Sequence, residues 1–212
     1  MSLIKHYIRI KRSVSSCEGV PEYQVTLDGE MMAAAGADTL LTDLYKARIG
    51  DYPKFYKMDP LCRLGFVASE LLLDAENRRE EQFGESRGVV LFNAASSLAD
   101  DRNYQETIKN PDAFFPSPSL FVYTLPNVLT GEIAIRNHYY GETNFIVLPH
   151  FDCAAMADGI RMSFTDRDLR SLLTGWVDCY SETSFDLLLF LVDSEVIGRE
   201  VELQREIEKL AK

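Results

Sequence analysis

A histidine, an aspartate and a cysteine lie close together in residues 149–153, which read Pro-His-Phe-Asp-Cys. This pentapeptide follows an apolar run and precedes a small-residue segment, residues 154–164, whose pattern predicts a helix. A cysteine that opens a helix lies next to free backbone amides and the positive end of the helix dipole, and both favour a thiolate. Cys153 is therefore a candidate nucleophile, and His150 is a candidate base beside it.

The same residues also fit a structural interpretation. Free cysteine is among the most buried residue types, and repulsion from Asp152 opposes a thiolate at Cys153. The three histidines, His6, His138 and His150, are widely spaced and do not assemble a convincing two-histidine site. Each also fits a surface or satisfied core position, so both interpretations stay open at this point.

Motifs for other site chemistry are missing. Ser96 and Ser97 follow an apolar run but lack the GxSxG elbow of serine hydrolases, so turn or capping roles are expected for them. No GxGxxG, GxxxxGK[ST] or HExxH pattern occurs. The four cysteines form no CxxC pair: Cys17, Cys62, Cys153 and Cys179. The sequence therefore predicts reduced thiols, no metal site and no cofactor.

Composition and charge narrow the class of protein. The chain has 212 residues, 46% of them hydrophobic, which suits one globular domain with a sizeable core. The net charge of −11 argues against a nucleic-acid partner and against an anionic membrane. The longest apolar run, residues 187–192, is far shorter than the roughly 20 residues that span a bilayer. With no signal peptide visible at the N-terminus, we expect a cytoplasmic protein.

The hydrophobic pattern alternates between strands and helices. Strands are expected at residues 6–10, 88–92, 144–148, 176–180 and 187–192, of which 88–92 and 144–148 have the apolar character of strands buried on both faces. Helices are expected at residues 33–45, 60–71, 100–109, 120–137 and 154–164, with a further helical turn at 166–173 and an amphipathic tail at 196–212. Asp59 and Pro60 predict a capped helix start, and Pro126 predicts a kink or restart. This order predicts an α/β fold with a mostly parallel five-stranded sheet and helices on both faces.

Several segments resemble a known family when they are taken in order. Residues 57–64 (KMDPLCRL) are similar to a helix start of the β-ketoacyl-acyl carrier protein synthases. Residues 88–97 (GVVLFNAASS) resemble a strand and turn of these enzymes. Residues 117–127 and 131–135 (SPSLFVYTLPN and GEIAI) resemble one of their helices, and residues 141–144 (GETN) fall where the family has GPN.

The resemblance covers roughly residues 57–192 and implies the N-terminal half of a thiolase-like condensing enzyme. It implies a ketosynthase N-terminal-like domain at residues 1–194 and an amphipathic C-terminal helix at residues 195–212. In that family the first half carries the nucleophilic cysteine, and the second half carries two histidines and a lysine. The sequence offers no counterpart for those second-half residues.

The family places its nucleophile seven residues after the asparagine of GPN, and that count from Asn144 reaches Phe151. Two registers are open. In the favoured one Phe151 replaces the nucleophile, which implies a degenerate synthase. In the other a two-residue bulge brings Cys153 into the nucleophile position.

Three functions are open, of which the first two follow from the resemblance. The first is a partner or chain-length-type subunit of fatty-acid or polyketide-type biosynthesis that lacks the full catalytic set. Its partners would be an acyl carrier protein and a second ketosynthase-like chain, in a homodimer or a heterodimer. The second is an active acyltransferase or condensing enzyme that uses Cys153 and His150. The third is a structural dimerisation domain without a ligand, which predicts no deep pocket below residues 144–154.

Overall fold

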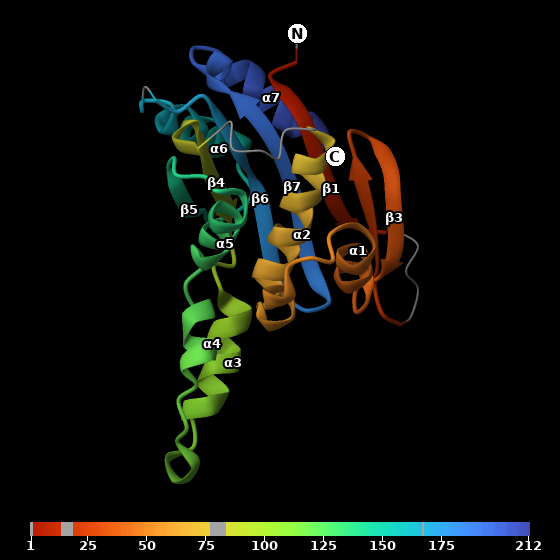
Figure 1. Ribbon diagram of the computed structural model, residues 1–212, viewed down its shortest axis with the longest axis vertical. Helices are drawn as coiled ribbons and strands as arrows, with labels where there is room; N and C mark the ends of the chain where they lie inside the picture. The colour runs from red at the N-terminus through yellow and green to blue at the C-terminus, as the bar shows by residue number, and fades with distance from the viewer. Residues whose placement is uncertain (1, 14–18, 77–83, 167) are drawn as a thin grey trace.

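Seven strands form a single sheet in the order β3-β2-β1-β7-β6-β4-β5 (Figure 1). A computed structural model describes residues 2–13, 19–76, 84–166 and 168–212, so Cys17 lies outside the described residues. The strands are β1 Ile4–Arg12, β2 Glu22–Leu27, β3 Glu30–Gly36, β4 Arg87–Asn93, β5 Thr143–Val147, β6 Ser171–Ser181 and β7 Ser184–Asp193. The α-helices are α1 Leu40–Arg48, α2 Pro60–Ala75, α3 Leu98–Ile108, α4 Pro118–Tyr123, α5 Val128–Asn137, α6 Cys153–Ser163 and α7 Glu200–Leu210. Short 3-10 turns lie at Pro53–Lys57, Gly84–Ser86, Pro111–Ala113 and Ser194–Val196.

The predicted α/β class is confirmed, but the prediction of five mostly parallel strands is wrong. Strand β4 runs parallel to β5 and to β6, whereas the described pairs β1–β2, β2–β3, β1–β7 and β6–β7 are antiparallel. The chain joins β2 to β3, and β6 to β7, through tight turns, and a short turn can connect only antiparallel neighbours. The sheet is therefore mixed.

Three local predictions also need correction. Residues 30–36 form strand β3, and the helix expected over 33–45 begins only at Leu40. The helical turn expected at 166–173 gives way to strand β6, which begins at Ser171. Strand β5 is an edge strand with exposed and half-buried residues, so it is not buried on both faces. By contrast, every residue of β4 is buried, as its apolar run predicted.

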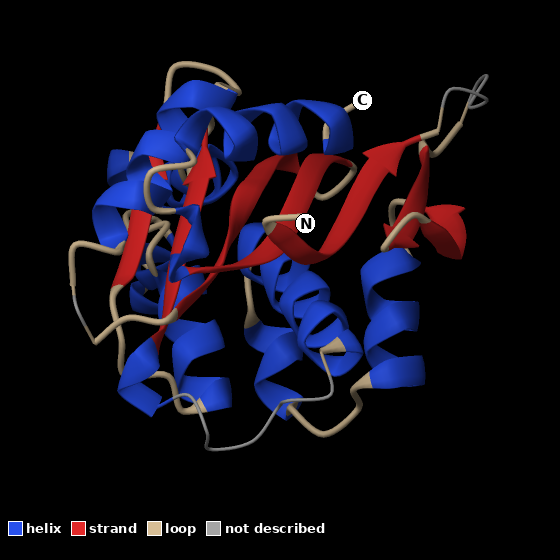
Figure 2. Cartoon of the chain, turned by 90° about the horizontal axis from the view of Figure 1, so that it is seen from above, coloured by secondary structure: helices blue, strands red, loops and turns tan. Residues whose placement is uncertain are grey.

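Helices cover both faces of the sheet (Figure 2). Helices α1, α2 and α5 pack on one face with Val89 and Leu91 of β4. Helices α6 and α7 pack on the other face with Val90 and Phe92. Because successive side chains of a strand point to opposite faces, β4 contributes to both halves of the core. The described residues contain no helix that is both long and apolar enough to cross a bilayer.

Helix α2 begins as its sequence predicted. Pro60 takes the first helical position, and the Asp59 carboxylate caps the helix by accepting hydrogen bonds from the backbone N–H groups of Leu61 and Cys62, at 3.1 and 3.2 Å. Proline suits this position because its missing N–H is one that the first turn leaves unpaired. The helix also lies centrally, against β1, β6 and β7.

Helices α3 and α4 form an arm that projects from one end of the molecule, with the turn Pro111–Ala113 at its tip (Figure 1). We call residues 98–123 the α3–α4 arm. Its two ends are joined at the base, where the Ser97 hydroxyl donates to the Thr124 carbonyl at 2.5 Å. The helix expected over 120–137 is interrupted after Tyr123 and restarts at Val128, which confirms the break predicted at Pro126.

Candidate functional site

The turn between β5 and α6 places the residues of the Pro-His-Phe-Asp-Cys segment. Strand β5 ends at Val147, and helix α6 begins at Cys153, as the pattern predicted to within one residue. Asp152 caps this helix. Its Oδ1 accepts hydrogen bonds from the backbone N–H groups of Ala154 and Ala155, at 2.9 and 3.1 Å. Two of the amides at the start of α6 are thus already bound to a carboxylate.

The electrostatic surroundings of Cys153 disfavour its charged form. The side chain is half-buried against the core beside α6 and α7. Burial, the negative charge of Glu208 on α7 and that of Asp152 raise the pKa of the Cys153 thiol to about 11. An activated cysteine needs the opposite, a lowered pKa near a positive charge. At neutral pH this cysteine is a thiol.

Phe151 fixes the turn to the core. Its half-buried ring meets the ring of Trp176 on β6 in an edge-on arrangement, with centroids 5.2 Å apart and planes at 75°. Trp176 is itself buried, and aromatic pairs of this geometry add stability beyond the area that they bury. The residue counted at the family's nucleophile position therefore has a packing role.

The structure does not bring the three histidines together. His150 is exposed in the turn, and no described residue forms a hydrogen bond or ion pair with it. His138 ends α5 in a left-handed conformation, with φ of 54°. His6 lies on β1, where its Nδ1 is 2.7 Å from Asp28 Oδ2. The three histidines thus lie at separate places in the fold.

The turn after β4 has structural hydrogen bonds throughout. Asn93 accepts from the Ser96 N–H at 3.0 Å and donates to the Ser96 carbonyl at 2.8 Å. Asp178 of β6 accepts from the Ala95 N–H at 3.0 Å. Ser96 has φ of 51°, which the Asn93 side chain holds in place. The turn role expected for Ser96 is confirmed, whereas Ser97 makes no side-chain capping bond to its helix and instead bonds to Thr124.

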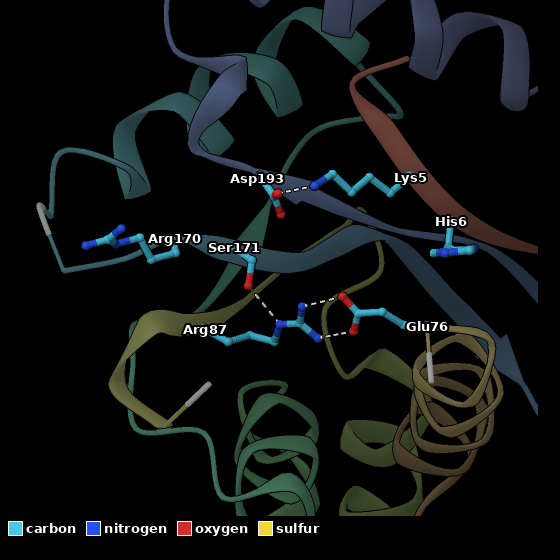
Figure 3. A pocket seen from close by; sticks show the side chains of 7 residues that line it. All are labelled: Lys5, His6, Glu76, Arg87, Arg170, Ser171 and Asp193. Atoms are coloured by element: carbon cyan, nitrogen blue, oxygen red, sulfur yellow. Dashed lines mark hydrogen bonds and ion pairs between the residues drawn. The ribbon is translucent and has the colours of Figure 1, made fainter. Parts of the chain in front are cut away.

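A charged cavity of about 230 Å³ lies at the opposite ends of the parallel strands (Figure 3). Arg87 and Ser171 begin β4 and β6, and the buried Arg87 guanidinium donates to both carboxylate oxygens of Glu76, at 2.6 and 2.7 Å, and to Ser171 at 2.8 Å. Lys5 forms an ion pair with Asp193 across the same cavity. These pairs connect β1, α2, β4, β6 and β7, so the charged side chains around the cavity hold these elements together. The cavity is remote from the β5–α6 turn.

Sequence reasoning missed one feature with chemical character, a pair of buried acids. Asp59 at the start of α2 and Asp100 on α3 are 7% and 2% exposed, and both line a cavity of about 210 Å³. The sequence identified Asp59 only as a helix cap. Asp100 looks like an ordinary acid in the first turn of a helix, so nothing in the sequence marks it as buried. Among the described residues, no group of histidines, cysteines and acids is arranged to hold a metal ion.

Comparison with known proteins defines the class of this fold. The sequence matches no family profile and no curated protein. Among solved structures it is similar to the ishigamide ketosynthase/chain length factor, with a TM-score of 0.59 and 22% identity over 70% of this chain and 47% of that one. It is also similar to a ketosynthase in complex with its chain length factor from Xenorhabdus doucetiae, with a TM-score of 0.52 and 13% identity over 68% of this chain and 61% of that one.

The fold is therefore a thiolase-like α/β fold. Within that class the chain has the fold of ketosynthases and chain length factors, which confirms the resemblance read from the sequence. The chain spans about half the length of the first of these structures. At such low identity the likeness concerns the fold, and function depends on the residues of the site itself.

Proposed function

We propose that this chain is a ketosynthase-like partner subunit of polyketide-type or fatty-acid acyl-chain assembly, without a working condensation site of its own. Phe151 is the observation that carries the proposal. By the family count it takes the nucleophile position, and its ring is engaged with Trp176. A phenyl ring has no group that can accept an acyl chain from a thioester.

The state of Cys153 supports the same proposal. Transfer of an acyl group to this cysteine needs its thiolate to attack the thioester carbonyl, form a new thioester and release the carrier's thiol. A thiol with a pKa of about 11 is almost entirely protonated at neutral pH. His150, the candidate base, is exposed and has no partner among the described residues that would orient it. The alternative of a Cys153-dependent acyltransferase is therefore the less favoured one.

The open edge of the sheet at β5 supports a role as one subunit of a protein complex. Strand β5 pairs only with β4 among the described strands, so its other side is an open edge on which a strand could add. Val147 at its end is 49% exposed. Phe121 and Val122 of the arm, and Leu125 just after it, are each about half exposed. Exposed apolar patches of this kind commonly mark protein interfaces.

A second ketosynthase-like chain is the partner that we propose for this surface. The structure from Xenorhabdus doucetiae is described as a ketosynthase in complex with its chain length factor, which is a heteromeric pair of this fold. In such a pair the other chain would supply the nucleophile and the remaining catalytic groups. An acyl carrier protein would then deliver the acyl thioester to that chain.

Co-expression with the ketosynthase-like chain of the same organism tests the proposal. We expect a one-to-one complex by size-exclusion chromatography with light scattering. Val147→Lys should weaken it by about tenfold or more, because a charge would enter an apolar contact. Val201→Lys is the matched control, since Val201 is 61% exposed on α7. The proposed interface would be overturned if no complex formed, or if both variants weakened the complex equally. If this chain instead formed a dimer with itself, the partner would be a second copy of this chain.

A further inference from the structure

The α3–α4 arm is anchored to the body by a carboxylic acid. Asp100 is the only buried side chain of α3, and α4 has none. The large apolar side chains of the arm, such as Phe114, Phe115 and Phe121, are more than half exposed. A helix on the surface of a domain usually packs through an apolar stripe. Here the most buried side chain of the arm is the acid Asp100, and the half-buried Tyr123 of α4 packs against the core beside it.

The group that Asp100 meets is a second acid. Asp100 lines the same cavity as Asp59, and the Asp59 carboxylate, which already accepts two backbone N–H groups of α2, is among the groups that raise the pKa of Asp100. No described donor reaches Asp100 Oδ2, although the atom is buried. Two buried carboxyl groups that line one cavity cannot both be charged at a tolerable cost, and one proton between them resolves both the repulsion and the missing donor.

We propose that Asp59 and Asp100 share one proton and that this acid pair is a latch that holds the α3–α4 arm against α2. The proton lies on Asp100, whose O–H donates to the Asp59 carboxylate. Asp59 is the acceptor because the N–H groups of Leu61 and Cys62 hold it in the orientation of a helix cap. Loss of the proton would leave two adjacent buried negative charges and would favour release of the arm.

The surroundings set the pH at which the latch opens. Burial is the largest cause, followed by Asp59 and Asp101, and together they raise the pKa of Asp100 to about 8. The other acid facing the cavity is Glu182 of the β6–β7 turn, and the cations that line it are Lys57 and Arg63.

The neighbouring thiols and the tyrosine phenol do not titrate in the pH range in which Asp100 loses its proton. Burial raises the pKa of Cys179 on β6 and of Tyr123 on α4 to about 12 each, and that of Cys62 on α2 well above its ordinary value. These groups remain neutral over the range in which Asp100 titrates. A transition near pH 8 in the arm is therefore assigned to the acid pair.

The latch would regulate docking, and this consequence rests on the proposed function. The arm carries the exposed Phe121 and Val122 that we assign to the partner surface. A rise in pH through 8 would loosen the arm and weaken the complex. The latch itself can be tested on the isolated chain, so its failure is distinguishable from failure of the proposed function.

Hydrogen–deuterium exchange of the isolated chain at pH 7 and pH 9 is the test, with exchange times scaled for the intrinsic rate. Protection of residues 98–108 should fall by about tenfold and level off above pH 8, because release gains about tenfold per pH unit only up to the Asp100 pKa of about 8. Residues 200–210 of α7, which lie on the other face of the sheet, serve as the internal reference.

Two variants make the outcome decisive. In Asp100→Asn the amide donates to Asp59 at every pH, so the loss of protection should disappear. In Asp59→Asn the helix cap is retained but the charge is removed, so the transition should move to lower pH. Asp112→Asn at the exposed tip should behave as the wild type. An unchanged transition in both Asp59→Asn and Asp100→Asn, or no transition in the wild type, would overturn the latch.

Discussion

The rings of Phe151 and Trp176 meet edge-on, with centroids 5.2 Å apart, and this contact joins the β5–α6 turn to the centre of the sheet. Trp176 lies on β6, which is separated from β5 by β4 in the sheet order. The contact therefore reaches across the neighbouring strand. It holds the half-buried Phe151 ring in the turn against the core.

The Phe151 contact predicts a measurable stability effect. Phe151→Ala should lower the free energy of unfolding by about 2 kcal/mol, less than the cost of a fully buried phenylalanine because the ring is half-buried. Since the chain has a single tryptophan, its fluorescence reports on Trp176 directly and should shift on substitution. Met162→Ala on the exposed side of α6 is the control and should change neither quantity. A Phe151→Ala protein with wild-type stability and fluorescence would contradict the contact.

Cys153 should react slowly with thiol reagents at neutral pH. With a pKa of about 11, only about one molecule in 10⁴ carries the thiolate at pH 7, and the alkylation rate should keep rising with pH up to pH 10. The rate is measured with iodoacetamide by mass spectrometry of the peptide that contains Cys153. A rate that levels off below pH 8 would show an activated thiolate and contradict this assignment.

The ion pair between Arg87 and Glu76 should be important for stability. Glu76→Gln removes one partner and leaves the buried guanidinium without its counter-charge, so we expect a loss of about 3 kcal/mol in urea unfolding. Glu106→Gln is the matched control, because Glu106 pairs with Lys109 in an exposed position. That change should cost about 0.5 kcal/mol or less. Equal losses in the two variants would argue against the buried pair.

The two ends of the described chain are joined by Glu206 of α7, and this contact should depend on pH. The Glu206 carboxylate accepts from the N–H groups of Leu3 and Ile4 at 3.0 Å and from the Ser2 hydroxyl at 2.7 Å. Although burial opposes it, these bonds lower the pKa of Glu206. Because the folded-state pKa is lowered, the stabilisation is present above the ordinary pKa of 4.5 and is lost as the pH falls below it.

The comparison of wild type with Glu206→Gln tests this dependence. We expect a difference of roughly 1 kcal/mol in the free energy of unfolding at pH 7, since the group is largely solvated. The difference should shrink as the pH falls toward 3. A difference that stays constant from pH 7 to pH 3 would show that the charge of Glu206 has no part in the contact.

The sequence predicted the fold where local signals agree with the tertiary structure. Asp59 and Pro60 marked the start of α2, and the apolar run of β4 marked a buried strand. The prediction failed at β3, whose alanines and methionines favour a helix, because pairing with β2 overrides that weak preference. The Asp28-Gly29 turn, with φ values of 52° and 85°, is a hairpin signal that could have revealed both strands.

The position of the candidate site was predictable from local sequence signals, but its chemistry was not. The Pro-His-Phe-Asp-Cys turn is a local feature, so its position between a strand and a helix could be read from the sequence. The contacts that decide its chemistry are long-range ones, from Trp176 to Phe151 and from Glu208 to Cys153. The cavity that Asp59 and Asp100 line is likewise formed only in the folded chain, by residues far apart in the sequence.

The most direct test of the central claim, that this chain has no working nucleophile, is its intact mass after incubation with acyl-carrier-protein thioesters of several chain lengths. Wild type and Cys153→Ala are compared, with folding of both checked by circular dichroism. We predict no mass gain in either protein. A gain of one acyl group in the wild type that is lost in Cys153→Ala would make Cys153 the nucleophile and contradict the account.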